Sequence, residues 1–119
     1  MPEITVPGEG TFEVAEDTRL VNAIEDNGID IMHRCGGHAR CTTCRVQLQE
    51  GEPERMTSAE RERLQKALLL GKIRLSCQIL CDHDMTVQPI YRVSTGDDDE
   101  PGPRPKDHIT PDPYWVDAP

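Results

Sequence analysis

Hydrophobic and polar positions alternate near the start of the chain in two short segments. Ile4 and Val6 mark the first segment, Phe12 and Val14 mark the second, and the turn residues Pro-Gly-Glu-Gly separate them. Alternation with a period of two is typical of half-buried β-strands, and the glycines between the segments favour a tight turn. The chain is therefore predicted to begin with a β-hairpin.

A helical period follows this hairpin. Apolar side chains recur at spacings of three and four residues at Leu20, Val21 and Ile24. Asp17 or Thr18 is the predicted N-cap, because short polar side chains can accept a hydrogen bond from the first helical turn. Asn27-Gly28 predicts a left-handed C-terminal stop. We expect this helix to place one apolar face on the sheet.

Two further strands are predicted downstream. Val46 and Leu48 alternate with polar residues up to Glu50-Gly51, and a similar alternation runs through Met85, Val87 and Pro89. Each pattern indicates a strand with one buried face. Together with the hairpin and the helix, these segments predict a small α+β domain.

A second helix is predicted between these two strands. The run Thr57-Ser58-Ala59-Glu60 has the spacing of a capping box, in which the first and last side chains each bond the other's backbone. Charged residues follow, with an apolar side formed by Leu64, Ala67 and Leu68. Gly71 is the predicted end of this helix.

The composition changes abruptly after Val93. Six of the ten prolines lie between Pro101 and Pro119, and residues 97–100 are all acidic. This composition predicts a domain at 1–93 and an acidic, proline-rich extension at 94–119 that does not join the core sheet. Tyr114 and Trp115 leave three interpretations open: a floppy tail, docking on the chain's own domain, or binding to a partner or second subunit.

Length, charge and cysteine count limit the function classes. A chain of 119 residues with 35% hydrophobic content suits one small domain. A formal net charge of −9 argues against nucleic-acid binding and favours a partner with a basic surface. No apolar run approaches the roughly 20 residues that span a bilayer, and no export signal is visible. With five cysteines, an odd number, a reducing cytoplasmic location is expected.

Four cysteines carry the strongest chemical signal. Their order is Cys35-x5-Cys41-x2-Cys44-x32-Cys77, so one loop supplies three thiolates and the distant segment RLSCQ supplies the fourth. Iron-sulfur clusters prefer soft thiolate ligands. The spacing therefore predicts that these four residues hold one 2Fe-2S cluster. The protein would then be a one-electron carrier and not an enzyme, since no acid-base or nucleophilic constellation is present.

Several residues near the cysteines are candidates for supporting roles. Gly36 and Gly37 allow the loop to curl around a cluster. Thr42 and Thr43 either donate to sulfur or bond only their own backbone. Four arginines near the cysteines leave three interpretations open. They adjust the reduction potential of the cluster, form a docking surface or are ordinary solubilising charges: Arg34, Arg40, Arg45 and Arg74. Three histidines are predicted at the surface, because four cysteines leave no vacancy for a histidine ligand: His33, His38 and His83.

The segments CGGHARCTTCRV and RLSCQ resemble those of 2Fe-2S ferredoxins, in particular the adrenodoxin-like group and related bacterial domains, over roughly residues 2–92. This resemblance implies a β-grasp fold with a mixed β-sheet, a crossing helix and a long cluster-binding loop. It implies the ligands Cys35, Cys41, Cys44 and Cys77. It also implies electron transfer between a ferredoxin reductase and an acceptor such as a monooxygenase.

Cys81 leaves alternatives open. It is a buried small side chain, a substitute ligand or a redox-sensitive thiol. A zinc-stabilised interaction module would use Cys41, Cys44, Cys77 and Cys81, because zinc accepts four thiolates tetrahedrally. That interpretation leaves Cys35 unused. A cluster-based redox sensor with a responsive tail and a homodimer formed through the tail also stay open.

Overall fold

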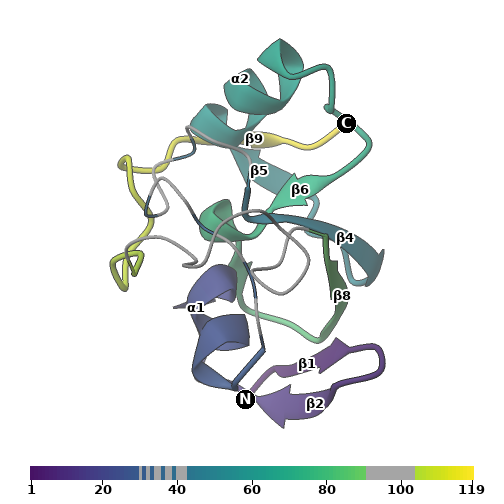
Figure 1. The fold of residues 1–119 in the computed structure, drawn as a ribbon. Coiled ribbons are helices and arrows are strands. Elements are labelled where there is room, and N and C mark those ends of the chain that lie inside the picture. Colours follow the sequence, from purple (N-terminus) through teal and green to yellow (C-terminus); the bar gives the residue numbers. More distant parts are fainter. Residues whose placement is uncertain (30, 32, 34–35, 37–38, 40–42, 91–103) are drawn as a thin grey trace.

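The computed structural model describes residues 1–29, 31, 33, 36, 39, 43–90 and 104–119. In this part of the chain, the centre is a five-stranded sheet with the order β2-β1-β8-β4-β6 (Figure 1). Its strands are β1 Glu3–Val6, β2 Gly10–Glu13, β4 Arg45–Glu50, β6 Arg74–Leu75 and β8 Met85–Pro89. β1 and β8 run parallel and the other pairs in this sheet are antiparallel. The sheet is therefore mixed, as the resemblance to ferredoxins implies.

The remaining elements surround this sheet. They are the helices α1 Leu20–Asp26 and α2 Ser58–Lys66, the 3₁₀ helix η1 Ser76–Gln78, the strand pair β3 Thr18–Arg19 with β7 Leu80–Cys81, and the strand pair β5 Arg55–Thr57 with β9 Trp115–Asp117. Strands and helices share one hydrophobic core, which includes Ile4, Val6, Leu20, Val21, Ile24, Val46, Leu64 and Val87. Together these elements form an α+β β-grasp fold.

The N-terminal hairpin forms as predicted. Ile4 of β1 lies opposite Phe12 of β2, and Gly8 in the turn has a φ of 82°. Ile4 also lies opposite Met85 in the parallel pairing of β1 with β8. Because Ile4 and Val6 are buried, the inward face of the hairpin fixes its register in the sheet.

Helix α1 has the predicted buried face but begins later than expected. Its N-cap is Arg19, and no side chain caps the helix. The predicted N-caps serve other purposes: Asp17 has a φ of 62°, and Thr18 pairs with Cys81 across β3 and β7. Gly28 has a φ of 80° and forms the predicted left-handed stop.

Helix α2 begins as predicted but lacks half of the capping box. The Thr57 hydroxyl accepts a hydrogen bond from the backbone N–H of Glu60 at 3.1 Å. The Glu60 carboxylate does not return to Thr57. It accepts hydrogen bonds from Arg74 and from the backbone N–H of Leu75 instead. A tertiary partner has therefore replaced the local one.

The predicted end of α2 at Gly71 is wrong. The helix ends at Lys66, and Ala67 is its C-cap. Leu68 follows in a left-handed conformation with a φ of 61°, and its side chain is 81% exposed. Leu64 is buried as expected, but Leu68 does not belong to the apolar side of the helix.

The C-terminal segment 104–119 folds back onto the domain, drawn in yellow in Figure 1. β9 pairs antiparallel with β5, with Trp115 opposite Thr57. The backbone N–H of Ser58 donates to the Tyr114 carbonyl at 2.7 Å, so the pairing continues beyond the strand. The segment stays out of the five-stranded sheet, as expected. Of the three interpretations left open by the sequence, the structure shows docking on the chain's own domain.

A second set of contacts fixes the beginning of this segment. Arg104 forms an ion pair with Asp26 at the end of α1, with N···O distances of 2.5 and 3.0 Å. The side-chain amide of Asn22 donates to the carbonyls of Pro105 and Lys106 at 3.1 and 3.2 Å. The segment is thus attached to α1 as well as to β5.

Neither helix in the described part of the chain is long and apolar enough to cross a lipid bilayer.

Candidate functional site

Two of the four predicted ligands, Cys44 and Cys77, lie in the described part of the chain. Cys44 directly precedes β4, and Cys77 lies in η1, which directly follows β6. Because Arg45 pairs with Leu75 across β4 and β6, both cysteines lie at the same end of these strands. Cys44 is 2% exposed and Cys77 is fully buried. The fold therefore brings together two cysteines that are far apart in the sequence.

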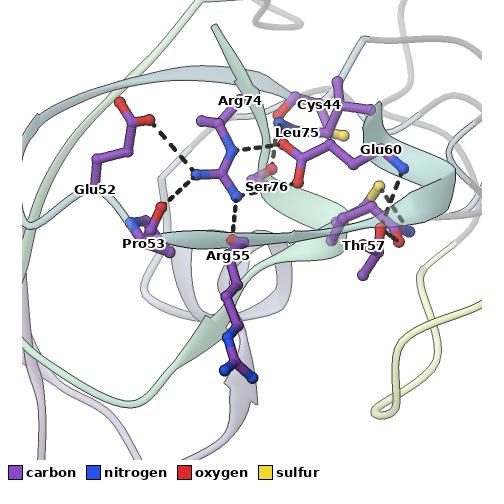
Figure 2. A network of polar contacts seen from close by, with 11 residues as sticks. Cys44, Glu52, Pro53, Arg55, Thr57, Glu60, Arg74, Leu75 and Ser76 are labelled. Atoms are coloured by element: carbon purple, nitrogen blue, oxygen red, sulfur yellow. Dashed lines mark hydrogen bonds and ion pairs between the residues drawn. The ribbon is translucent and has the colours of Figure 1, made fainter. Parts of the chain in front are cut away.

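Ser76 links the two cysteine segments directly. Its backbone N–H and its hydroxyl both donate to the Cys44 carbonyl, at 3.1 and 2.7 Å. Ser76 lies beside Cys44 in Figure 2. Since Ser76 immediately precedes Cys77, these bonds hold the two ligand segments side by side. The other two predicted ligands, Cys35 and Cys41, lie outside the described residues.

Two described positions in the cysteine loop have left-handed backbone. Gly36 has a φ of 70°, and its N–H donates to the His33 carbonyl at 2.8 Å. This conformation confirms the expected need for glycine there; Gly37 lies outside the described residues. Ala39 has a φ of 58°, which is unfavourable for a residue with a Cβ atom. Such strain is concentrated at ligand-binding loops.

Arg19 is a site residue that the sequence did not reveal. It is fully buried, and its Nε donates to the Cys77 carbonyl at 2.5 Å. Its terminal nitrogens donate to the carbonyls of Lys106 and His108 at 3.1 Å and of Thr110 at 3.4 Å. One side chain thus connects the turn that carries Cys77 to the C-terminal segment. These partners are distant in sequence, so no local pattern marks Arg19.

Gln78 also lies at the site without having been predicted there. Its Nε2 atom lies 3.6 Å from Cys77 Sγ and 2.9 Å from the Thr110 carbonyl oxygen. Its Oε1 atom accepts a hydrogen bond from the Thr57 hydroxyl at 2.7 Å. The one available signal was its place directly after Cys77 in the segment RLSCQ.

A buried ion pair lies beside this turn (Figure 2). Arg74 Nε and Nη2 donate to the Glu60 carboxylate at 2.9 and 3.2 Å, and the Leu75 N–H donates to it at 2.8 Å. Arg74 also donates to the carbonyls of Pro53 and Arg55 at 3.0 and 2.9 Å. Burial raises the pKa of the Glu60 carboxyl, while the Arg74 and Leu75 donors act in the opposite direction. The pair ties α2, β5 and β6 together.

The arginine predictions therefore need correction. Arg74 is 3% exposed, so its interpretation as a docking or solubilising charge is wrong. Its guanidinium group bonds the backbone carbonyls of Pro53 and Arg55 and the buried carboxylate of Glu60. Arg45 lies half-buried in β4. Arg34 and Arg40 lie outside the described residues, as does Thr42, whereas Thr43 is buried at the end of the loop.

The surface prediction is wrong for His33. This side chain is buried, and its Nε2 contacts the carboxylate of Glu25 in α1. His83 is at the surface as expected, with 41% of its side chain exposed. A hydrogen bond to the Gly51 carbonyl at 2.6 Å raises the pKa of His83. His38 lies outside the described residues.

Cys81 is a buried free thiol in β7. Burial raises the pKa of this thiol to about 12, and the nearby Asp82 carboxylate adds to the effect. A thiol with so high a pKa is protonated at neutral pH and is a poor nucleophile. The structure thus favours the inert interpretation of Cys81.

This burial predicts that Cys81 resists alkylation in the folded protein. A rise in pKa from 9.0 to about 12 lowers the thiolate fraction at pH 8 roughly a thousandfold, before steric exclusion is counted. We expect no iodoacetamide adduct on Cys81 by peptide mass spectrometry under native conditions, and full modification in denaturant. Rapid native modification would contradict the placement of Cys81 in the core.

The described residues fit an iron-sulfur cluster by the chemistry of their donors. Cys44 and Cys77 offer two soft sulfur ligands from adjacent, hydrogen-bonded segments, and Gln78 directs an N–H group at the Cys77 sulfur. All-cysteine ligation with hydrogen bonds to sulfur is the environment that such clusters use.

The comparisons with known proteins point to the same cofactor. The sequence model of the 2Fe-2S iron-sulfur cluster binding domain matches residues 4–82. The 2Fe-2S ferredoxin of Pseudomonas aeruginosa is 34% identical over 106 residues, spanning 79% of this chain and 95% of that protein. The 2Fe-2S ferredoxin of Escherichia coli is 33% identical over 106 residues, spanning 79% of this chain and 96% of that protein. A component of the Na(+)-translocating NADH-quinone reductase of Methylococcus capsulatus is 33% identical over 85 residues, or 71% of this chain, which spans only 21% of that component's length.

Solved structures of similar fold are ferredoxins as well. The ISC-like 2Fe-2S ferredoxin from Pseudomonas putida has a TM-score of 0.60 at 27% identity, covering 74% of this chain and 91% of that one. A chain of the covalent putidaredoxin reductase-putidaredoxin complex has a TM-score of 0.57 at 29% identity. The match covers 72% of this chain and 95% of that one. The zinc alternative finds no support among these matches. The chain belongs to the family of 2Fe-2S ferredoxins, and it is an electron carrier with one 2Fe-2S cluster rather than an enzyme.

Proposed function

We propose that this ferredoxin shuttles single electrons between a ferredoxin reductase and an acceptor enzyme such as a monooxygenase, with Cys35, Cys41, Cys44 and Cys77 as its cluster ligands. The observation that carries this proposal is the junction of Cys44 with the Cys77 turn through Ser76. When bound, the cluster accepts and releases one electron.

The protein's own residues prepare the site for that role. Burial of Cys44 and Cys77 excludes water from two of the proposed ligands. Arg19 holds the backbone of Cys77, and Ser76 holds the backbone of Cys44. These hydrogen bonds preorganise the two proposed ligand segments, as a functional site requires.

Two observations support a reductase as one partner. The putidaredoxin in the similar complex is bound to putidaredoxin reductase, and its chain covers most of this fold. The net charge of −9 suits a partner with a basic docking face. The acceptor is proposed by chemical class only, as an enzyme that takes electrons one at a time.

We further propose that residues 1–93 form the cluster domain and residues 94–119 an extension that docks on it. The contacts of β9 with β5 and of Arg104 with Asp26 support this division. Because the described part of the tail is bound to its own domain, dimerisation through the tail is not part of the proposal. The odd cysteine count supports a reducing, cytoplasmic location.

Anaerobic purification followed by reduction tests the proposal. We expect a coloured protein whose visible absorbance bleaches on addition of dithionite, with an electron paramagnetic resonance signal from the reduced cluster. Mixed with NADH or NADPH, a flavin-containing ferredoxin reductase and cytochrome c, it should support cytochrome c reduction. Apoprotein is the matched control. A correctly assembled cluster that no such reductase reduces would overturn the partner assignment and leave the cofactor assignment standing.

A further inference from the structure

Gln78 occupies a position from which it can act on the cluster through Cys77. Its side chain is completely buried, and Nε2 lies 3.6 Å from Cys77 Sγ, within hydrogen-bond distance for sulfur. Burying a side-chain amide is costly unless its groups find partners, and besides the sulfur this one bonds the Thr57 hydroxyl and the Thr110 carbonyl. A buried amide next to a ligand sulfur therefore calls for a chemical explanation.

The hydrogen-bond network fixes which way this amide points. The Thr57 hydroxyl accepts from the Glu60 N–H, so its own hydrogen is available to donate to Gln78 Oε1 at 2.7 Å. With Oε1 used as the acceptor, Nε2 faces Cys77 Sγ and the Thr110 carbonyl. The amide is thus held by Thr57, the N-cap of α2, on one side and by the C-terminal segment on the other. Its NH₂ group is directed at the Cys77 sulfur.

We propose that Gln78 is a positioning residue that raises the reduction potential of the cluster through an N–H···S bond to Cys77. Reduction adds negative charge, part of which resides on the ligand sulfurs, and a donor aimed at sulfur stabilises the reduced state more than the oxidised one. The bond lies in a buried environment of low dielectric constant, where such an interaction is strengthened. The inference rests on the proposed assignment of Cys77 as a ligand.

The C-terminal segment takes part in this arrangement. Its Thr110 carbonyl accepts from Gln78 at 2.9 Å and lies 3.4 Å from Arg19, whose Nε bonds the Cys77 carbonyl. Two buried side chains that contact Cys77 therefore share one acceptor in the tail. The docked tail thus supplies an acceptor to both groups beside Cys77.

The replacement Gln78→Met tests the proposal, since it keeps the length of the side chain and removes both polar groups. At a fixed potential near the midpoint, we expect the ratio of reduced to oxidised cluster to fall about tenfold, which corresponds to a midpoint about 59 mV more negative for one electron. The midpoint is measured by anaerobic spectroelectrochemistry. The matched control is Gln88→Met in β8, because the Gln88 amide donates to the carbonyl of the adjacent Pro89. In this control variant, the ratio of reduced to oxidised cluster should change less than twofold.

A second measurement uses the unaltered protein and does not depend on how the variant folds. With glutamine side chains labelled with ¹⁵N, pulsed electron paramagnetic resonance of the reduced cluster should detect hyperfine coupling to one side-chain nitrogen. This coupling should persist in Gln88→Met and disappear in Gln78→Met. Absence of any such coupling in the unaltered protein, or a ratio in Gln78→Met within twofold of the unaltered value, would overturn the role of Gln78.

The ligand assignment is tested separately by Cys77→Ser. Loss of the normal cluster spectrum in that variant shows that Cys77 is a ligand, whatever the result for Gln78. An unchanged spectrum would overturn the ligand assignment and with it the inference for Gln78. If only the Gln78 tests contradict expectation, the proposed electron-carrier function still stands.

Discussion

Replacement of Cys77 with serine is expected to remove most of the visible spectrum of the cluster, whereas the same replacement at Cys81 leaves the spectrum unchanged. Substituting a residue that only supports a ligand costs about 10–100-fold in metal affinity, so losing a thiolate ligand should cost at least as much. We therefore expect the affinity of Cys77→Ser for the cluster to fall at least about tenfold, with a loss of cluster-bound iron. Iron content per chain and anaerobic absorbance measure the effect.

Cys81 is a well-matched control for this experiment. Both cysteines are completely buried, they are four positions apart, and each variant exchanges one sulfur for one oxygen. A general loss of stability should therefore affect the two variants similarly. Loss of the cluster in Cys81→Ser together with retention in Cys77→Ser would reverse the assignment of the fourth ligand.

The second large effect is expected at the buried ion pair. Arg74→Met leaves the Glu60 carboxylate buried without its two guanidinium hydrogen bonds. Breaking a buried pair on one side costs about 3–5 kcal/mol. In a domain of this size, we expect the apparent Tm to fall by roughly 10 °C or more. Thermal unfolding of the anaerobic, cluster-loaded protein at one fixed scan rate measures the change, because cluster loss makes unfolding irreversible.

The double variant Glu60→Met with Arg74→Met separates charge burial from packing. Replacing both members of a buried pair with apolar groups is often neutral, so the double variant should regain most of the lost Tm. The exposed i,i+4 pair of Glu62 and Lys66 in α2 is the matched control, since Lys66→Met should cost less than about 1 kcal/mol. A double variant as unstable as Arg74→Met would show that the lost hydrogen bonds of Arg74 to the Pro53 and Arg55 carbonyls, rather than the unpaired Glu60 charge, dominate the loss.

The strands β1, β2, β4 and β8 and the start of α2 could be predicted because their signals are local. Alternation at Ile4 and Val6 specifies both a strand and its buried face, and Thr57 caps a helix that begins at the next residue. The predicted return bond from the Glu60 side chain to Thr57 is absent, because a prediction from local spacing ignores tertiary partners. Glu60 prefers Arg74, which is fourteen positions away, and spacing alone cannot reveal that competition.

The candidate site shows the same limit. Spacing predicted which cysteines hold the cluster, because a cluster needs sulfur ligands in a recognisable order. It did not identify Arg19, whose partners in the C-terminal segment lie 87 to 91 positions away. His33 was expected at the surface because the cysteines leave no vacancy for a histidine ligand, and that argument does not reveal its contact with Glu25 in α1. Residues that act through tertiary partners have no local signature.

The tail was the hardest part to predict from composition. Its docking uses backbone hydrogen bonds of β9 and side chains of the domain that reach its carbonyls, and Tyr114 itself remains 71% exposed. Backbone pairing depends little on which side chains the segment carries. A proline-rich, acidic composition therefore did not indicate whether the segment would dock.

The position of Trp115 gives the chain a built-in optical probe. It is the only tryptophan in the sequence, it stands in β9 opposite Thr57, and 39% of it is exposed. Release of β9 from β5 would move this indole fully into water and change its emission, while the colour of the protein would report separately on the cluster. Fluorescence and visible absorbance recorded on one unlabelled sample can therefore show which event comes first during unfolding, undocking of the tail or loss of iron.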